Sequence, residues 1–247
     1  MSSPPGGRRW YKRWGYQVIR FSVWCLFVVC FRFRAVHNHR IPRTGGALLC
    51  PNHTSHLDPL IGGISTTRPM NFLAKKELFS VPFLRSLISF LDSIPIDRFG
   101  LSAGAIKEML KRLKREEMVL MFPEGTRSLD GNMGVVKSGF ATLARRIQVP
   151  VIPIGIEGSY RAWPRNRKFP MPGRRILVVV GEPISPEVYG QLSDDEFTDL
   201  LENRIKDCIR ECRRRMKWAP ERIEEGLNVR RLSDAPTSVD EIDAAAG

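Results

Sequence analysis

The sequence predicts one α/β domain, built on a mostly parallel sheet that helices cover on both faces, with a membrane-associated helix at its N-terminus. Short apolar runs alternate with longer stretches of helical periodicity, which is typical of consecutive βα units. The runs are continuously apolar, as strands are when both faces of a sheet are buried. With 247 residues, 43% of them hydrophobic, the chain is long enough for one such core.

The N-terminal segment is predicted to be a membrane-associating helix. Residues 21–31 carry no charge, and Arg20, Arg32 and Arg34 flank them. A helix of this length spans about 16 Å, roughly half of a hydrocarbon core near 30 Å. We therefore expect a helix that lies in the interface or is half inserted; a transmembrane span starting near Gly15 and packing against the domain are the alternatives. We do not expect a signal peptide, because a small-residue cleavage site is missing.

The central elements are predicted from apolar runs and helical spacing. Residues 102–116 form the clearest helix, because Ile106, Met109, Leu110 and Leu113 lie at core spacing. The predicted strands are residues 46–51, 70–74, 94–96, 118–122, 151–156 and 176–180.

The C-terminal part is predicted to be a covering helix followed by a tail. Residues 193–196 form a capping-box sequence, and the apolar residues that follow lie on one side of a helix. From about Pro220 the chain becomes polar and aperiodic, which predicts disorder. The predicted regions are a basic and apolar membrane-associating segment, a globular domain and a polar tail: residues 1–40, 41–218 and 219–247.

The charge of the chain predicts an anionic partner. The formal net charge is +13, which fits a phospholipid surface, a phosphorylated substrate or a nucleic acid. Basic residues on both sides of the apolar segment at residues 21–31 favour the lipid surface. No interleaved aromatic and basic motif of the RNA-binding type is present, so we do not expect a nucleic-acid partner.

Cysteine and histidine spacing predicts neither disulfides nor a metal site. The 5 cysteines are scattered and odd in number, which fits a reduced compartment. All 4 histidines lie between His37 and His56, but their spacing is not that of a zinc site and no cysteine completes one. His56 is therefore predicted to be structural.

The first candidate functional residues are His53 and Asp58. On one helix their side chains would lie roughly 140° apart, so a bend must bring them together. The run 46–51 predicts a strand before them, and Pro59 suits the first turn of a helix and disfavours helical backbone at Asp58. A carboxylate that accepts the Nδ1 proton leaves Nε2 free to act as a general base. Because the chain has no Gly-x-Ser-x-Gly elbow, the activated hydroxyl is expected to belong to the substrate.

A second candidate cluster follows the strand predicted at residues 118–122. Gly125 permits a close backbone approach, and Arg127 offers a planar fork of donors for a phosphate or carboxylate. Glu124 is expected to orient Arg127 or to bind a hydroxyl. Arg98 follows the strand 94–96 in the same way, so arginines at two strand ends predict an anionic substrate.

Four sequence blocks together resemble the ordered motifs of the glycerolipid acyltransferase family, which includes lysophosphatidate acyltransferases. They are residues 52–58, 96–98, 122–127 and 151–154, and their order and spacing also match. Residues 74–78 resemble the family's lysine-containing block, and residues 137–139 resemble its glycine segment. The resemblance covers residues 45 to 185, within the predicted acyltransferase domain.

The resemblance implies the roles of the site residues. His53 would deprotonate a glycerol hydroxyl, Asp58 would orient His53, and the hydroxyl would attack an acyl thioester directly, with no acyl-enzyme. The other implied roles are phosphate binding by Lys75, Arg98 and Arg127, glycerol positioning by Glu124, Gly125 and Thr126, and lining of the acyl side by Pro153.

The implied reaction moves a fatty acyl group from acyl-CoA or acyl carrier protein to 1-acyl-sn-glycerol 3-phosphate (lysophosphatidate), giving phosphatidate for phospholipid biosynthesis. No further cofactor is expected. The expected location is the cytoplasmic face of the inner or plasma membrane, on its phospholipid surface. Another lysolipid or glycerol 3-phosphate is the alternative acceptor, and a non-catalytic membrane lipid-binding protein is the alternative of another class.

Overall fold

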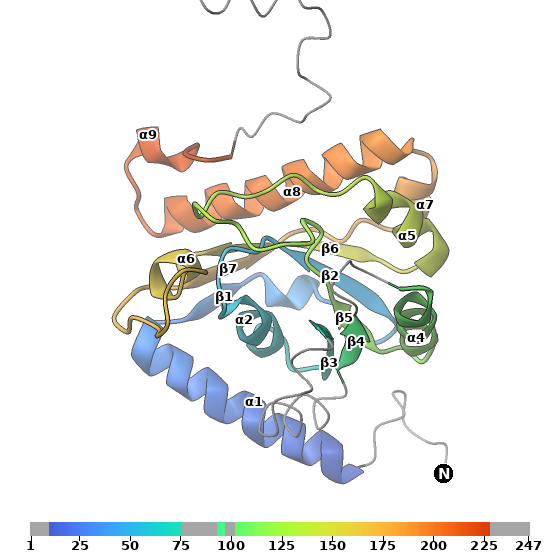
Figure 1. The fold of residues 1–247 in the computed structure, drawn as a ribbon, viewed down its shortest axis with the longest axis horizontal. Coiled ribbons are helices and arrows are strands. Elements are labelled where there is room, and N and C mark those ends of the chain that lie inside the picture. The colour runs from blue at the N-terminus through green and yellow to red at the C-terminus, as the bar shows by residue number, and fades with distance from the viewer. Residues whose placement is uncertain (1–9, 76–92, 97–101, 228–247) are drawn as a thin grey trace, which may run out of the picture.

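A computed structural model of the chain describes residues 10–75, 93–96 and 102–227. The predicted second motif at Asp97 and Arg98 lies outside the described residues, and so does the end of the predicted tail. The described part consists of one sheet with helices on both sides (Figure 1).

Within the described residues the sheet has seven strands, in the order β1-β7-β6-β2-β5-β3-β4. All its pairings are parallel except the antiparallel pair β6–β7, so the predicted mostly parallel sheet is confirmed. The edge strand β1 was not predicted, because a short run that begins with arginine lacks the apolar pattern. The strands are β1 (Arg34–Val36), β2 (Ala47–Pro51), β3 (Met70–Lys75), β4 (Ile94–Ile96), β5 (Met118–Leu120), β6 (Val151–Glu157) and β7 (Leu177–Val180).

The two largest hydrophobic clusters of the described residues lie on the two faces of the sheet. In β2, Leu48 and Cys50 point into one core, while Ala47 and Leu49 point into the other, and all four are fully buried. This explains why the strand reads as a continuous apolar run. Helices α4 (Ala103–Lys114), α5 (Gly139–Ile147), α7 (Pro186–Gly190) and α8 (Asp194–Arg215) cover one face; α1 (Trp10–Phe31) and α2 (Asp58–Ile64) cover the other.

Helix α8 starts at the predicted capping box. The Ser193 hydroxyl accepts from the Glu196 N–H, and the Glu196 carboxylate accepts from the Ser193 N–H. Its apolar side lies so close to β6 that a Cβ added at Gly155 would come within 2.6 Å of the α8 backbone. Glycine at this position therefore lets the helix pack directly on the strand.

Part of the predicted tail is ordered. After α8 the chain forms the short helix α9 (Pro220–Ile223), and Leu227 is fully buried. Arg210 pairs with Glu224, and the Arg213 guanidinium donates to the carbonyls of Ile223 and Glu225. These polar contacts order a segment that has no apolar periodicity.

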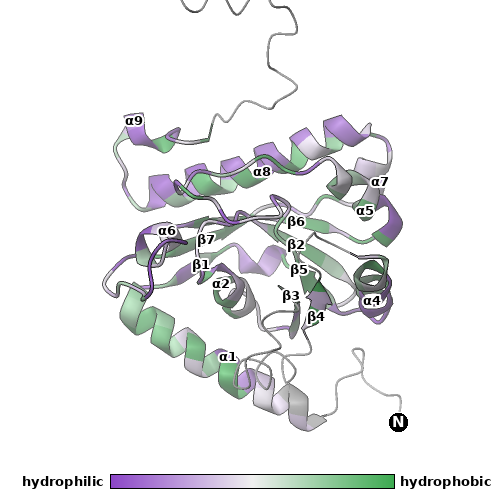
Figure 2. Cartoon of the chain, in the orientation of Figure 1, coloured by the Kyte–Doolittle hydropathy of each residue, from purple (hydrophilic) through white to green (hydrophobic). Residues whose placement is uncertain are grey.

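Helix α1 packs on the domain with one side only. Tyr16, Phe27 and Phe31 are buried in the core that α2 also covers, and the Tyr16 hydroxyl accepts from the Met70 N–H at 3.1 Å. The other side exposes large apolar residues, and Val29 is 81% exposed. By length and composition α1 could cross a membrane. Figure 2 shows this apolar helix along the margin of the molecule. The choice between an in-plane helix and a span stays a prediction.

Candidate active site

His53 and Asp58 lie together in the turn between β2 and α2. The two side chains meet with His53 Nδ1 3.0 Å from Asp58 Oδ2. Helix α2 begins at Asp58 itself, one residue before the start that Pro59 predicts. The sharp strand-to-helix turn brings the pair together at the carboxyl end of a central strand, where ligands bind in open α/β sheets.

The Asp58 carboxylate is fixed by its hydrogen bonds. Besides His53, the same oxygen accepts from the backbone N–H groups of Thr54 and Ser55, each at 2.7 Å. The side chain is fully buried, and Oδ1 has no hydrogen-bond partner. A carboxylate held in this way can orient an imidazole and stabilise its protonated form.

The His53 ring is held by stacking and remains accessible. It stacks on Phe122 with ring centroids 3.7 Å apart, and its side chain is 15% exposed. Nδ1 is used by Asp58, and the described residues offer no hydrogen-bond partner to Nε2. Nε2 is therefore the ring nitrogen available to accept a proton.

The backbone of His53 is held on both sides by the segment that follows β5. The His53 N–H donates to Glu124 Oε1 at 2.7 Å, and the Ser128 N–H donates to the His53 carbonyl at 2.8 Å. Glu124 Oε2 accepts from the Gly134 N–H at 2.8 Å. The expectation that Glu124 orients Arg127 or binds a hydroxyl is thus not what the geometry shows, because both carboxylate oxygens bind backbone N–H groups.

Burial changes the proton affinity of Glu124. Its side chain is nearly inaccessible, and this burial raises the pKa of Glu124 to about 8, although the two backbone hydrogen bonds act in the opposite direction. A Cβ added at Gly134 would lie 2.8 Å from Glu124 Oε2, so glycine there allows the contact. Glu124 is therefore a buried residue whose hydrogen bonds connect the turn at His53 to the loop at Gly134.

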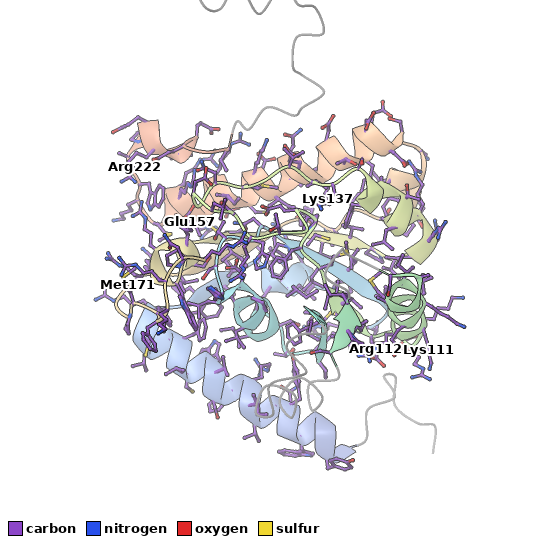
Figure 3. The ribbon with its side chains drawn as sticks, in the orientation of Figure 1. Lys111, Arg112, Lys137, Glu157, Met171 and Arg222 are labelled. Atoms are coloured by element: carbon purple, nitrogen blue, oxygen red, sulfur yellow. The ribbon has the colours of Figure 1, made fainter. Side chains whose placement is uncertain are left out.

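Gly125 and Thr126 lie at the surface of the same turn. Gly125 has a φ of +70°, and a Cβ there would lie 2.8 Å from Cε of Lys137. Another residue would therefore be strained and would displace the lysine. Thr126 is exposed. The Lys137 side chain, labelled in Figure 3, comes from the segment leading into α5.

Arg127 lies against His56. Its Nη1 is 2.5 Å from Nδ1 and 2.8 Å from Nε2 of that imidazole. Partial burial, followed by the nearby Arg165, lowers the pKa of Arg127. Burial also lowers the pKa of His56, which favours a neutral ring beside the guanidinium. Within the described ranges Arg127 forms no ion pair with a carboxylate, so its charge is available to an anion.

The segment after α6 (Ser159–Ala162) completes this side of the site, and sequence reasoning missed it. The His56 N–H donates to the Trp163 carbonyl at 3.3 Å, and the two rings lie 5.1 Å apart. His56 Nε2 lies 3.3 Å from the Arg165 carbonyl. No motif marks these residues in the sequence.

The remaining predicted residues are placed differently. Lys75 ends β3 and pairs with Ile96 in β4, and its side chain is outside the described part of the structure. Pro153 is opposite Cys50 in the middle of the sheet and packs beneath α8 against Gly181 and Cys208. The structure does not bring Pro153 to the His53–Asp58 pair. Among the described residues, no three His, Cys, Asp or Glu side chains are close enough to hold a metal ion.

The chain is similar in sequence and in fold to known acyltransferases. The family model named Acyltransferase matches residues 33–157. The 1-acyl-sn-glycerol-3-phosphate acyltransferase of Pseudomonas aeruginosa is 30% identical, over 78% of this chain and 75% of that protein. The enzyme of the same name from Bacillus subtilis is 26% identical, over 70% of this chain and 86% of the relative. The crystal structure of the 1-acyl-sn-glycerophosphate (LPA) acyltransferase PlsC from Thermotoga maritima superposes with a TM-score of 0.71 at 26% identity, covering 84% of this chain and 83% of that one.

Proposed function

The chain belongs to the Acyltransferase family, and from this premise we propose that it acylates the free hydroxyl of 1-acyl-sn-glycerol 3-phosphate to form phosphatidate. The acyl donor is a thioester, either acyl-CoA or acyl carrier protein. The names of the curated relatives support this acceptor. The observation that carries the proposal is the buried Asp58 carboxylate bound to His53 Nδ1, with Nε2 left without a partner among the described residues.

His53 acts as the general base in a direct transfer. Its Nε2 takes the proton of the acceptor hydroxyl while the hydroxyl oxygen attacks the thioester carbonyl carbon. The C–O bond forms, the C–S bond breaks, and the thiolate leaves with the proton from the imidazolium. Asp58 keeps the proton on Nδ1 and stabilises the imidazolium. Direct attack needs no acyl-enzyme.

Arg127 binds the acceptor phosphate together with the predicted partners Arg98 and Lys75. A guanidinium that is partly buried and lacks a carboxylate partner in the described ranges interacts strongly with an incoming dianion, because less water screens the charge. Gly125 and Thr126 lie next to Arg127 and border the glycerol. Glu124 acts indirectly, by holding the His53 backbone.

The acceptor is reached at a membrane surface. The exposed apolar side of α1 faces away from the core, while its buried side is tied to the domain. This favours an in-plane helix on the cytoplasmic leaflet, because a helix that crossed the bilayer would lose the contacts of Tyr16 and Phe27.

The test is acyl transfer by the purified protein. Labelled acyl-CoA and acyl carrier protein are offered with lysolipids that carry or lack a phosphate monoester. We expect transfer to phosphate-bearing acceptors and a loss of about 10² to 10⁴ in turnover for His53→Ala. The control is His39→Ala, the same change at an exposed histidine outside the turn. Transfer to acceptors without phosphate, or full turnover by folded His53→Ala, would overturn the proposal.

A further inference from the structure

The loop between α6 and β7 is strongly basic and exposed. Between Glu157 and Glu182 the sequence contains six basic residues and no acidic residue. We call residues 165–174 the basic loop. Arg165, Arg167, Lys168 and Arg174 are exposed in it, and no carboxylate of the described residues forms an ion pair with them. Such a loop attracts anions, and the carboxylates of the described residues do not compete for its charges.

The basic loop also exposes a large apolar side chain. Phe169 is 73% exposed and is followed by Pro170. A single exposed aromatic residue is ordinary on a soluble surface. Here it lies directly after Arg167 and Lys168, a combination that suits the headgroup region of a bilayer, where charge and apolar surface are both satisfied.

One end of the basic loop is attached to the C-terminal end of α1. The Gly173 N–H donates to the Cys30 carbonyl at 2.7 Å, and the Ile176 N–H donates to the Phe31 carbonyl at 2.9 Å. The neighbouring α1 residues Leu26 and Val29 are exposed. In Figure 3, Met171 of the loop lies at the same margin of the molecule as this end of α1. The loop therefore extends the apolar side of α1 with positive charge.

The other end of the basic loop reaches the active site. The Arg165 carbonyl lies 3.3 Å from His56 Nε2, and that imidazole contacts Arg127. The loop thus spans from the apolar end of α1 to the proposed phosphate site.

We infer that the basic loop, together with the exposed side of the C-terminal half of α1, docks onto a bilayer that contains anionic phospholipid. Phe169 enters the interface, and Arg167, Lys168 and Arg174 bind lipid phosphates. This inference rests on the proposed function in that the acceptor resides in the bilayer. A nucleic acid would be attracted by the same charges, but the adjoining apolar side of α1 gives a lipid surface the better complementarity.

The test measures binding of the full-length chain to phosphatidylcholine vesicles with and without phosphatidylglycerol. The loop variant carries Arg167→Gln, Lys168→Gln and Arg174→Gln. The matched control carries Arg146→Gln, Arg204→Gln and Arg214→Gln. These three exposed arginines lie on α5 and α8, which cover the face of the sheet opposite to α1 (Figure 1). Both lose the same net charge.

We expect the loop variant to bind anionic vesicles about 10²-fold more weakly than the parent, from the loss of three charges near the surface. The control should lose much less affinity for anionic vesicles, and the binding of both variants to neutral vesicles should change little. Added salt should weaken the binding of the parent to anionic vesicles. Phe169→Ser should weaken binding to both vesicle types. Equal losses in the loop variant and the control would overturn the inference, as would tighter binding to an RNA oligomer than to anionic vesicles.

A second readout separates this inference from the proposed function. Acyl transfer to a short-chain, water-soluble lysophosphatidate is measured without vesicles. We expect the loop variant to match the parent there and to lose activity only on vesicle-borne acceptor. A parent that transfers no acyl group would refute the proposed function, while the vesicle-binding comparison would still decide the inference. A loop variant that fails on the soluble acceptor while unfolding at the parent's temperature would contradict the docking role.

Discussion

Asp58→Asn tests the central pair with little change in shape. The asparagine oxygen can take the place of Oδ2 and keep the hydrogen bonds from His53 Nδ1 and from the Thr54 and Ser55 N–H groups. Its NH₂ group would then occupy the place of Oδ1, which is buried without a partner. A buried unpaired donor costs about 1 to 3 kcal/mol of stability, partly offset because an unpaired charged oxygen is removed.

The catalytic loss follows from the missing charge. At the 3.0 Å separation of Nδ1 and Oδ2, a carboxylate stabilises an imidazolium by about 3 to 5 kcal/mol at an effective dielectric constant near 20, allowing for the larger distance between charge centres. We therefore expect turnover to fall by about 10² to 10⁴. The small exposure of His53 and the full burial of Asp58 limit screening by solvent.

The assay is the initial rate of acyl transfer at saturating donor and acceptor, with thermal unfolding measured in parallel. Asp195→Asn, at an exposed position in the first turn of α8, is the matched control and should behave as the parent. Near-parent turnover by a folded Asp58→Asn protein would refute the reasoning, because the imidazolium would then need no carboxylate.

Three further predictions concern Arg127, Glu124 and the direct attack by the acceptor. Arg127→Lys should raise the acceptor KM by about tenfold or more and leave the donor KM nearly unchanged, since an ammonium cannot reproduce the planar fork; equal changes in both constants would place the phosphate elsewhere. The pKa of Glu124 rises from its ordinary value of 4.5 to about 8 in the folded protein. Between these two pH values the folded protein keeps the Glu124 proton, whereas the unfolded chain releases it. The free energy of unfolding should therefore fall as pH rises through this window, by at most about 5 kcal/mol. Denaturant titrations at several pH values should show that the free energy of unfolding of Glu124→Gln depends less on pH than that of the parent. The same pH dependence in both proteins would contradict the raised pKa. Direct attack by the acceptor predicts intersecting double-reciprocal lines, whereas parallel lines or a trapped acyl-protein would contradict it.

The fold could be predicted largely from local pattern. Continuous apolar runs mark buried strands such as β2 and β6, and the capping box at Ser193 marks the start of α8. The strand β1 and the antiparallel direction of β7 could not be predicted, because both depend on which strand is available as a neighbour. That information is in the tertiary structure and not in the local sequence.

The site could be predicted only in part, for a similar reason. His53 and Asp58 are near each other in sequence, so a bend was enough to predict their contact. A glutamate such as Glu124 is suited to substrate binding. In the structure, however, its two carboxylate oxygens accept hydrogen bonds from the backbone N–H groups of His53 and Gly134. The contact of His56 with Arg127 depends on two loops that are far apart in the sequence, and no sequence motif indicates that they lie close together.

The way His53 is held has a consequence for biosynthesis of the protein. The carboxylate that binds its N–H group lies 71 residues further along the chain, and the N–H group bound to its carbonyl lies beyond that. On the ribosome, a nascent chain that has exposed β2 and α2 but not β5 has no means to hold the base in position. Catalytic activity therefore requires that β5 and the segment after it have joined the sheet. Incomplete translation products that end before Ser128 would be catalytically inactive, even if α1 binds them to the bilayer.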